Sequence, residues 1–138
     1  MILEWTKNIA VGVDVIDEQH KALFHVLNSL AEAIDRNSGA NEIERVLGFL
    51  EGYVSEHFST EEKMMKKVSC PGYKEHIDQH NIFIESFEEI RKVYRSEGAT
   101  DELLLMLKSK LCNWLFSHIM MVDKRMGLFL NEPGALEE

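Results

Sequence analysis

The chain contains few cysteines and few prolines, and this excludes some classes of protein. Of its 138 residues, two are cysteine and two are proline. The cysteines, Cys70 and Cys112, fit neither a disulfide framework nor a zinc ribbon, so we expect free thiols in a reducing compartment. Scarce proline, together with many Leu, Glu, Lys and Met residues, favours a helical fold.

Long apolar runs and basic runs are also absent. No apolar stretch approaches the ~20 residues of a membrane-spanning helix, and the opening MILEWTKNIA lacks the basic start and apolar core of a signal peptide. No run of Lys and Arg exceeds two residues, and the net charge is −9. Nucleic acid and anionic membranes attract basic surfaces, so we expect neither as a partner. We expect a cytoplasmic chain whose partners are small molecules or other proteins.

Apolar residues recur at spacings of three and four in four segments, which is typical of helices with one buried face. The segments run from Asp14 to about Asp35, from about Asn41 to the SCPG turn at 69–72, from about Tyr73 to Tyr94, and from Thr100 to a break near Gly127. Asp14 and Asp17 offer acceptors to the first-turn amides of the first helix, as Thr100 does for the last. Short connections make successive helices antiparallel, so we predict an all-α, up-down-up-down antiparallel four-helix bundle.

The two ends of the chain show no helical period. We predict that residues 1–13 form an extended N-terminal arm, which packs on the bundle through Ile2, Trp5 and Val11. The last residues, NEPGALEE (131–138), are predicted to be a flexible tail. At this length the whole chain, 1–138, is expected to be a single domain.

Polar side chains lie on the inward faces of all four predicted helices. They are His20, His57, Glu61, His76, His80 and His118. A single histidine on such a face is more often a core residue than a ligand, but burying this many unpaired groups would cost several kcal/mol for each charge. Residues four apart on a helix lie about 6 Å apart. Therefore His76 and His80 can bind one ion, and so can His57 and Glu61.

Asp123 adds a second carboxylate. It follows His118 by five residues, about 140° further round an α-helix, so the two need not serve one ion identically. If Asp123 and Glu61 bridge two ions, both acids are satisfied and the histidines remain as terminal ligands. Nitrogen and oxygen ligands without thiolate suit iron or manganese better than structural zinc, with zinc an alternative in vitro. The pattern predicts a dinuclear metal site.

Four stretches, WTKNIAVGVDVIDEQHKALF, HFSTEE, HIDQH and WLFSHIMMVDK, resemble the successive signatures of the hemerythrin family, and particularly those of bacterial hemerythrins, from Trp5 to about Leu130. The resemblance implies a single hemerythrin-like domain with two iron ions (Fe²⁺/Fe³⁺), an oxo or hydroxo bridge and no haem. It assigns the ligands as follows: His76, His80 and His118 hold one iron, His20 and His57 hold the other, and Glu61 and Asp123 bridge them.

The resemblance also implies a function. Two octahedral irons offer about twelve positions, of which the protein ligands and the oxygen bridge fill about eleven. The open position falls on the iron with two histidines, where dioxygen can bind reversibly. Five apolar side chains would line it and limit the access of water: Leu23, Phe58, Trp114, Leu115 and Ile119. We expect reversible dioxygen binding for storage, transport or delivery, and no enzymatic activity.

Other functions stay open at this stage. The chain could be an oxygen or redox sensor that acts through a partner or an attached signalling module, or a di-iron enzyme that handles peroxide or nitric oxide. An oxidase or a signalling protein is the expected protein partner. Met126 stands three residues after the bridging aspartate, where many relatives carry a tyrosine, and this bears on resistance to autoxidation. Glu62 is expected beside the ligands or facing solvent, and His25 on the surface.

Overall fold

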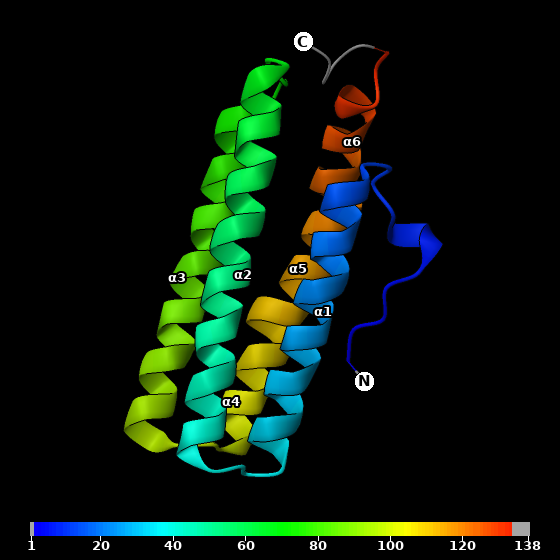
Figure 1. Cartoon of the computed structure of the whole chain (residues 1–138). Coiled ribbons are helices and arrows are strands. Elements are labelled where there is room, and N and C mark those ends of the chain that lie inside the picture. The colour runs from blue at the N-terminus through cyan, green and yellow to red at the C-terminus, as the bar shows by residue number, and fades with distance from the viewer. Residues whose placement is uncertain (1, 134–138) are drawn as a thin grey trace.

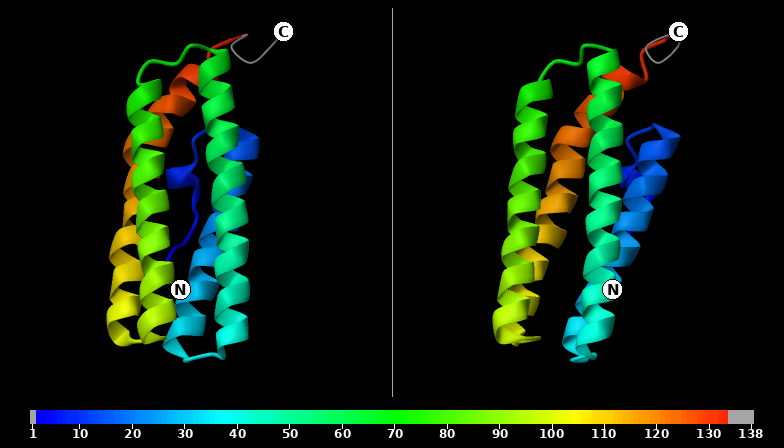
Figure 2. Two further views of the ribbon diagram at one scale, coloured as in Figure 1. Left: turned by 90° about the vertical axis from the view of Figure 1, so that its left-hand side faces the viewer. Right: turned by 60° about the vertical axis from the view of Figure 1, so that its left-hand side comes forward.

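The computed structural model, which describes residues 2–133, is built from helices, and no strand occurs among those residues (Figure 1). Its principal elements are α1 (Asp14–Asp35), α2 (Ala40–Lys67), α3 (Tyr73–Glu97), and a fourth rod that comprises α4 (Asp101–Met106), η2 (Leu107–Asn113), α5 (Trp114–His118), η3 (Ile119–Asp123) and α6 (Lys124–Leu130). Successive rods run in opposite directions (Figures 1 and 2). The predicted antiparallel four-helix bundle is confirmed. The predicted tail falls largely on 134–138, outside the described residues.

The fourth rod is one continuous helix with two π-helical segments, η2 and η3. Thr100 caps its start, because the Thr100 hydroxyl accepts a hydrogen bond from the Leu103 amide at 3.1 Å, as predicted. The predicted break near Gly127 is wrong, since α6 continues to Leu130. Position 127 requires glycine for a different reason, because a Cβ there would overlap the carbonyl oxygen of Val11. The glycine lets the arm approach the helix closely.

The N-terminal arm packs along the bundle as predicted, with one short 3-10 turn, η1 (Lys7–Ile9). Val11 is buried and Trp5 packs against the core, but Ile2 is 37% exposed, so its prediction as an anchor is wrong. Leu3 is the buried neighbour. Asn28 on α1 sets this register, because its side-chain oxygen accepts hydrogen bonds from both the Ile2 and Leu3 amides at 3.0 and 2.9 Å.

Asp17 does not cap the first turn of α1 as predicted. Its carboxylate instead accepts hydrogen bonds from the amides of Val11 at 2.8 Å and Gly12 at 3.2 Å. Asn131, just after α6, donates its side-chain amide to the Val11 carbonyl at 3.3 Å. The end of the arm is therefore tied to α1 on one side and to the end of the fourth rod on the other.

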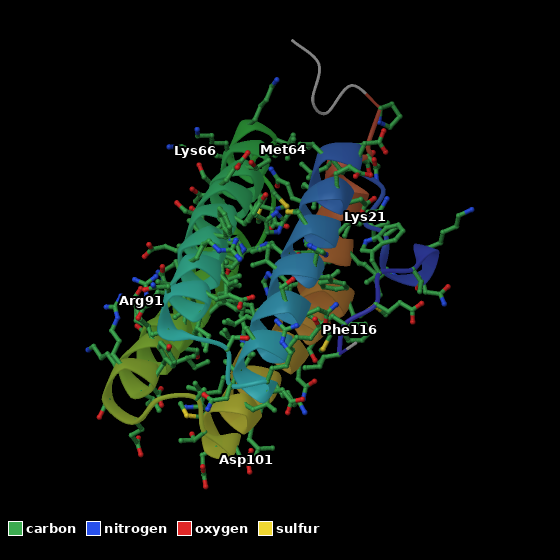
Figure 3. All side chains as sticks on the ribbon, turned by 60° about the horizontal axis from the view of Figure 1, so that its bottom comes forward. Lys21, Met64, Lys66, Arg91, Asp101 and Phe116 are labelled. Atoms are coloured by element: carbon green, nitrogen blue, oxygen red, sulfur yellow. The ribbon has the colours of Figure 1, made fainter. Side chains whose placement is uncertain are left out.

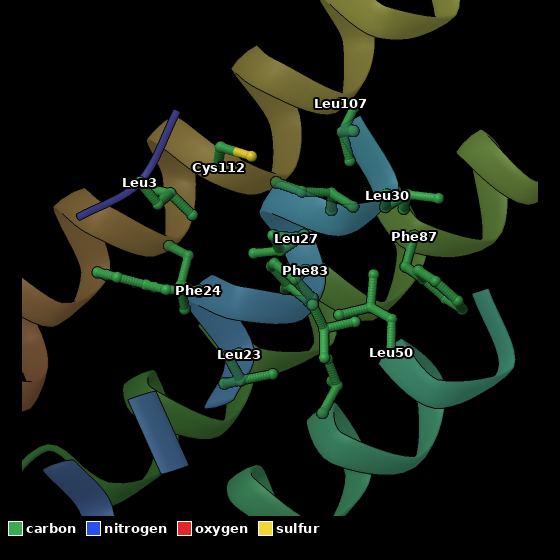
Figure 4. Packing of buried hydrophobic residues seen from close by; sticks show 14 of the residues in the cluster. Leu3, Leu23, Phe24, Leu27, Leu30, Leu50, Phe83, Phe87, Leu107 and Cys112 are labelled. Atoms are coloured by element: carbon green, nitrogen blue, oxygen red, sulfur yellow. The ribbon is translucent and has the colours of Figure 1, made fainter. Parts of the chain in front are cut away.

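Most of the buried interior is apolar, and a cluster of buried polar side chains interrupts it. Side chains from α1, α2, α3 and η2 pack together in the apolar core, including Leu30, Leu50, Phe83 and Leu107 (Figure 4). Charged side chains such as those of Lys66 and Arg91 point outward (Figure 3). Among the described residues, no helix combines the length and the apolar character needed to cross a membrane.

Candidate metal centre

The seven predicted ligands lie together inside the bundle. They come from α1, α2, α3, α5 and η3. Each is buried, with at most 3% of its surface exposed. Their possible ligand atoms form two groups, within each of which all atoms lie within 4.8 Å of one another. One group is Glu61, His76, His80, His118 and Asp123, and the other is His20, His57, Glu61 and Asp123.

Glu61 belongs to both groups and divides its two oxygens between them. Its Oε1 atom lies 3.1 Å from Nε2 of His80 and 3.3 Å from Nε2 of His76. Its Oε2 atom lies 3.2 Å from Nε2 of His57 and 3.5 Å from Nε2 of His20. One carboxylate thus faces histidines from three helices.

Asp123 divides its oxygens in the same way. Its Oδ1 atom lies 3.0 Å from Nε2 of His76 and 3.1 Å from Nε2 of His118. Its Oδ2 atom lies 3.1 Å from Nε2 of His20. The two shared carboxylates therefore stand where bridging ligands between two cations would stand.

The π-helical segment η3 explains how His118 and Asp123 come to face the same point. Sequence reasoning assumed an α-helix, in which the two side chains diverge by about 140°. The Lys124 amide instead donates to the carbonyl of Ile119, five residues earlier. This spacing is that of a π-helix, which brings residues five apart onto one face and is frequent at functional sites.

The donor atoms of the cluster fit a bound cation better than they fit one another. Seven of them are buried and make no hydrogen bond: both ring nitrogens of His20, Nε2 of His57 and of His118, Oε2 of Glu61, and both carboxylate oxygens of Asp123. Buried polar atoms without partners are costly, so a native fold rarely keeps this many in one place. Metal coordination would satisfy six of the seven, since only Nε2 of His20 faces the two carboxylates.

In the metal-free protein, protons on two imidazoles compensate part of the negative charge of the carboxylates. Burial of His20 and His76 opposes their charging, but the neighbouring carboxylates of Asp123 and Glu61 outweigh it and raise the pKa of each imidazole to about 9. Burial likewise opposes ionisation of the two acids, yet the surrounding imidazoles hold the pKa values of Glu61 and Asp123 well below their usual range. Protonated imidazoles therefore compensate the two ionised carboxylates, and a metal ion would displace those protons.

Three ligand histidines are contacted at their Nδ1 atoms by polar side chains from a neighbouring helix. The Nδ1 atom of His57 lies 2.8 Å from Oε1 of Gln19, and that of His118 lies 2.7 Å from Oε1 of Gln79. Sequence reasoning missed both glutamines, although each directly precedes a predicted ligand. Glu62 lies beside the ligands as expected, with its Oε2 atom 2.8 Å from Nδ1 of His80.

Two of the five apolar side chains predicted to line the open position contact histidines of the cluster. Phe58 stacks on His80 with ring centroids 3.8 Å apart, and Trp114 stacks on His118 at 4.7 Å. Both rings cover histidines of the larger group. The other three are buried: Leu23, Leu115 and Ile119. Their role around a bound gas molecule stays a prediction.

Three sulfur-containing side chains are also buried, and two of them lie near His76. Met126 lines a hollow of about 290 Å³ that reaches His76 and Cys70. Both cysteines are free, and burial raises the pKa of the Cys112 thiol to about 11, so this group stays protonated. His25 is exposed, as predicted.

Comparisons with known proteins point to one family. A family model described as the hemerythrin HHE cation binding domain matches residues 11–128. A bacteriohemerythrin of Stenotrophomonas maltophilia is 33% identical over 119 residues, 86% of this chain and 74% of that protein. One of Pseudomonas aeruginosa is 33% identical over 118 residues, 85% of this chain and 74% of that protein. A crystal structure of wild-type hemerythrin superposes with a TM-score of 0.81 at 26% identity, covering 96% of this chain and all of that one.

Proposed function

This chain belongs to the hemerythrin family, and we propose that it binds dioxygen reversibly at a di-iron site, for oxygen storage, transport or delivery. One iron would be held by His76, His80 and His118, the other by His20 and His57, with Glu61 and Asp123 bridging them. The proposal includes an oxo or hydroxo bridge from solvent and no haem. It makes the chain an oxygen-binding protein and not an enzyme.

A single observation carries the proposal. Glu61 and Asp123 each present one oxygen to the group of three histidines and the other oxygen to the group of two. Such sharing needs two cations, because a single ion could not be reached by both oxygens of both acids and by all five imidazoles. Nitrogen and oxygen donors without thiolate favour iron over a structural zinc.

When bound, the two irons would supply the electrons for reversible oxygen binding. The protein's own side chains hold the metals, orient the imidazoles and exclude water. Gln19 and Gln79 accept hydrogen bonds from the Nδ1 atoms of His57 and His118, which leaves each Nε2 lone pair directed into the cluster. Phe58 and Trp114 cover the imidazole faces with apolar surface. Dry surroundings slow the proton transfer that would make oxygen binding irreversible.

An optical titration tests the function. The purified protein is reduced without oxygen, its iron is quantified, oxygen is admitted, and argon then removes the oxygen while the visible spectrum is followed. We expect two irons per chain and an absorption change that appears with oxygen and reverses under argon. Immediate and irreversible conversion to the oxidised spectrum would contradict reversible binding and favour a redox sensor or an enzyme.

The arm supplies one observation in favour of a second function, an oxygen or redox sensor. Asp17, which holds the amides of Val11 and Gly12, lies on α1 three residues before His20. Movement of α1 with the state of the site would therefore reach the arm. Trypsin cleavage after Lys7 measures this coupling. A rate that differs between the reduced and oxidised proteins supports the sensor, and equal rates count against it.

A further inference from the structure

Neighbouring side chains contact His80 at both ring nitrogens and on one ring face. Its Nε2 atom faces Glu61 at 3.1 Å, its Nδ1 atom lies 2.8 Å from Oε2 of Glu62, and its ring stacks on Phe58 with an interplanar angle of 3°. A carboxylate only accepts hydrogen bonds, so Nδ1 must carry the proton. With a metal bound in the cluster, the Nε2 lone pair of His80 would then be directed at that metal.

The chemical identity of the partner distinguishes His80 from His57 and His118. Those two imidazoles donate to the neutral amide oxygens of Gln19 and Gln79. His80 donates to an acid, and a charge-assisted hydrogen bond of this kind is roughly twice as strong as a neutral one. Of the three side chains that contact these Nδ1 atoms, Glu62 is therefore the one acid. It acts on a histidine of the three-histidine group.

Glu62 can carry that charge because it reaches water. Its side chain is 30% exposed, and it lines a groove of about 430 Å³ between α2 and α3, together with Phe58 and Asn81. The charge is transmitted through the imidazole to whatever Nε2 binds, because a carboxylate behind a ligand histidine makes that ligand more basic.

We propose that Glu62 is a positioning residue that fixes the tautomer of His80 and makes the three-histidine iron the more easily oxidised of the two. This rests on the proposed di-iron function. Added negative charge stabilises Fe³⁺ relative to Fe²⁺, because the ferric ion carries one more positive charge. Removing the negative charge of Glu62 would make the one-electron reduction Fe³⁺ + e⁻ → Fe²⁺ more favourable at the three-histidine iron. The two irons then differ in potential partly through a residue that binds neither.

Charge and hydrogen bonding can be separated by substitution. Glu62→Gln keeps an oxygen that can accept from His80 but removes the charge, whereas Glu62→Ala removes both. Gln79→Glu adds a carboxylate behind His118 and should act in the opposite direction. Glu85→Gln is the matched control, because Glu85 is an exposed acid on α3. For each variant, iron content is measured, and the midpoint potentials are obtained by stepwise reductive titration with dithionite under argon.

We expect Glu62→Gln to retain two irons per chain and to raise one midpoint potential more than Glu85→Gln does. Gln79→Glu should lower a potential, and Glu62→Ala should weaken iron binding by roughly 10- to 100-fold. Equal potentials in Glu62→Gln and Glu85→Gln would overturn this inference and leave oxygen binding standing. Iron-loaded wild-type protein that fails to bind oxygen reversibly would overturn the proposed function alone, since the potentials still report on Glu62. A wild-type chain that takes up no iron would overturn both.

Discussion

The Nε2 atom of His118 lies 3.1 Å from Oδ1 of Asp123, although the two residues are five positions apart on one helix. The π-helical segment η3 between them makes this contact, because an α-helix would turn the aspartate about 140° away. The helix therefore departs from its regular geometry at the point where the carboxylate must face two groups of histidines. The π-helical segment thus places Asp123 where both groups of candidate ligands can share it.

Glu61 is the second shared acid, and its removal tests the cluster most directly. We expect Glu61→Ala to lower the iron content well below two per chain, because the variant loses an oxygen donor to each group. In the metal-free protein it should cost about 3–5 kcal/mol of unfolding free energy, since buried imidazoles lose the acid that compensates them. Iron analysis and urea unfolding measure the two effects. Glu56→Ala, at an exposed position on the same helix, is the control, and two irons per chain in Glu61→Ala would contradict the ligand assignment.

Leu115 tests the apolar surroundings of the site. It is fully buried on α5, so Leu115→Ala should cost about 2–5 kcal/mol of unfolding free energy and leave a cavity near the cluster. Water entering that cavity should speed autoxidation without changing the iron content. Stopped-flow absorbance gives the lifetime of the oxygenated protein. Leu105→Ala on the same rod is the control because Leu105 is 65% exposed, and an unchanged lifetime in Leu115→Ala would remove Leu115 from the predicted pocket.

Gly127 tests the attachment of the arm. A Cβ at this position would meet the Val11 carbonyl, so Gly127→Ala should displace the arm and lower the unfolding free energy by about 1–3 kcal/mol. Trypsin should then cleave after Lys7 faster than in the wild type. Gly48→Ala is the matched control, since nothing lies within 4 Å of a Cβ there, and it should stabilise α2 by up to about 1 kcal/mol. A Gly127→Ala variant as stable as Gly48→Ala would show that the contact with the Val11 carbonyl does not restrict this position.

The sequence was sufficient to predict the bundle and to place six of the seven polar side chains on inward helix faces, whereas Asp123 was expected about 140° further round its helix. Four-residue spacings such as that of His76 and His80 survive in any regular helix, and the buried stripe identifies the inward face. The resemblance of the chain to a known family then supplied the pairing of ligands. None of this required knowledge of how the helices meet.

The features that could not be predicted depend on contacts between distant segments. Gln19 reaches His57 on another helix, and neither periodicity nor composition marks it. Gly127 was interpreted as a helix end because glycine usually ends helices, whereas its role is to admit the arm. Ile2 and Leu3 are both apolar, and only the hydrogen bonds to Asn28 decide which of them faces inward. The π-helical geometry of η3 likewise has no signature in residue spacing.

The protons of the metal-free cluster predict how its stability depends on pH. His20 and His76 have an ordinary pKa of 6.5 when unfolded and a pKa of about 9 when folded, so the folded state retains protons that the unfolded chain releases. Their contribution is complete below pH 6.5 and is lost as the pH rises through about 9. Glu61 and Asp123 act oppositely, because their lowered pKa values give stability that is lost as the pH falls. The metal-free protein should therefore be most stable in mildly acidic solution.

Bound iron should abolish the alkaline part of this dependence, because metal ions replace protons on ligand imidazoles. Urea unfolding of chelator-treated protein at pH 6 and pH 9 measures how much unfolding free energy is lost between the two pH values. Iron-loaded protein should lose much less unfolding free energy over the same range. Glu61→Gln is the informative variant. It removes one of the two acids that raise the pKa values of His20 and His76, so its metal-free form should lose less stability between the two pH values than the wild type does. An equal loss in both metal-free proteins would mean that groups outside the cluster release the protons.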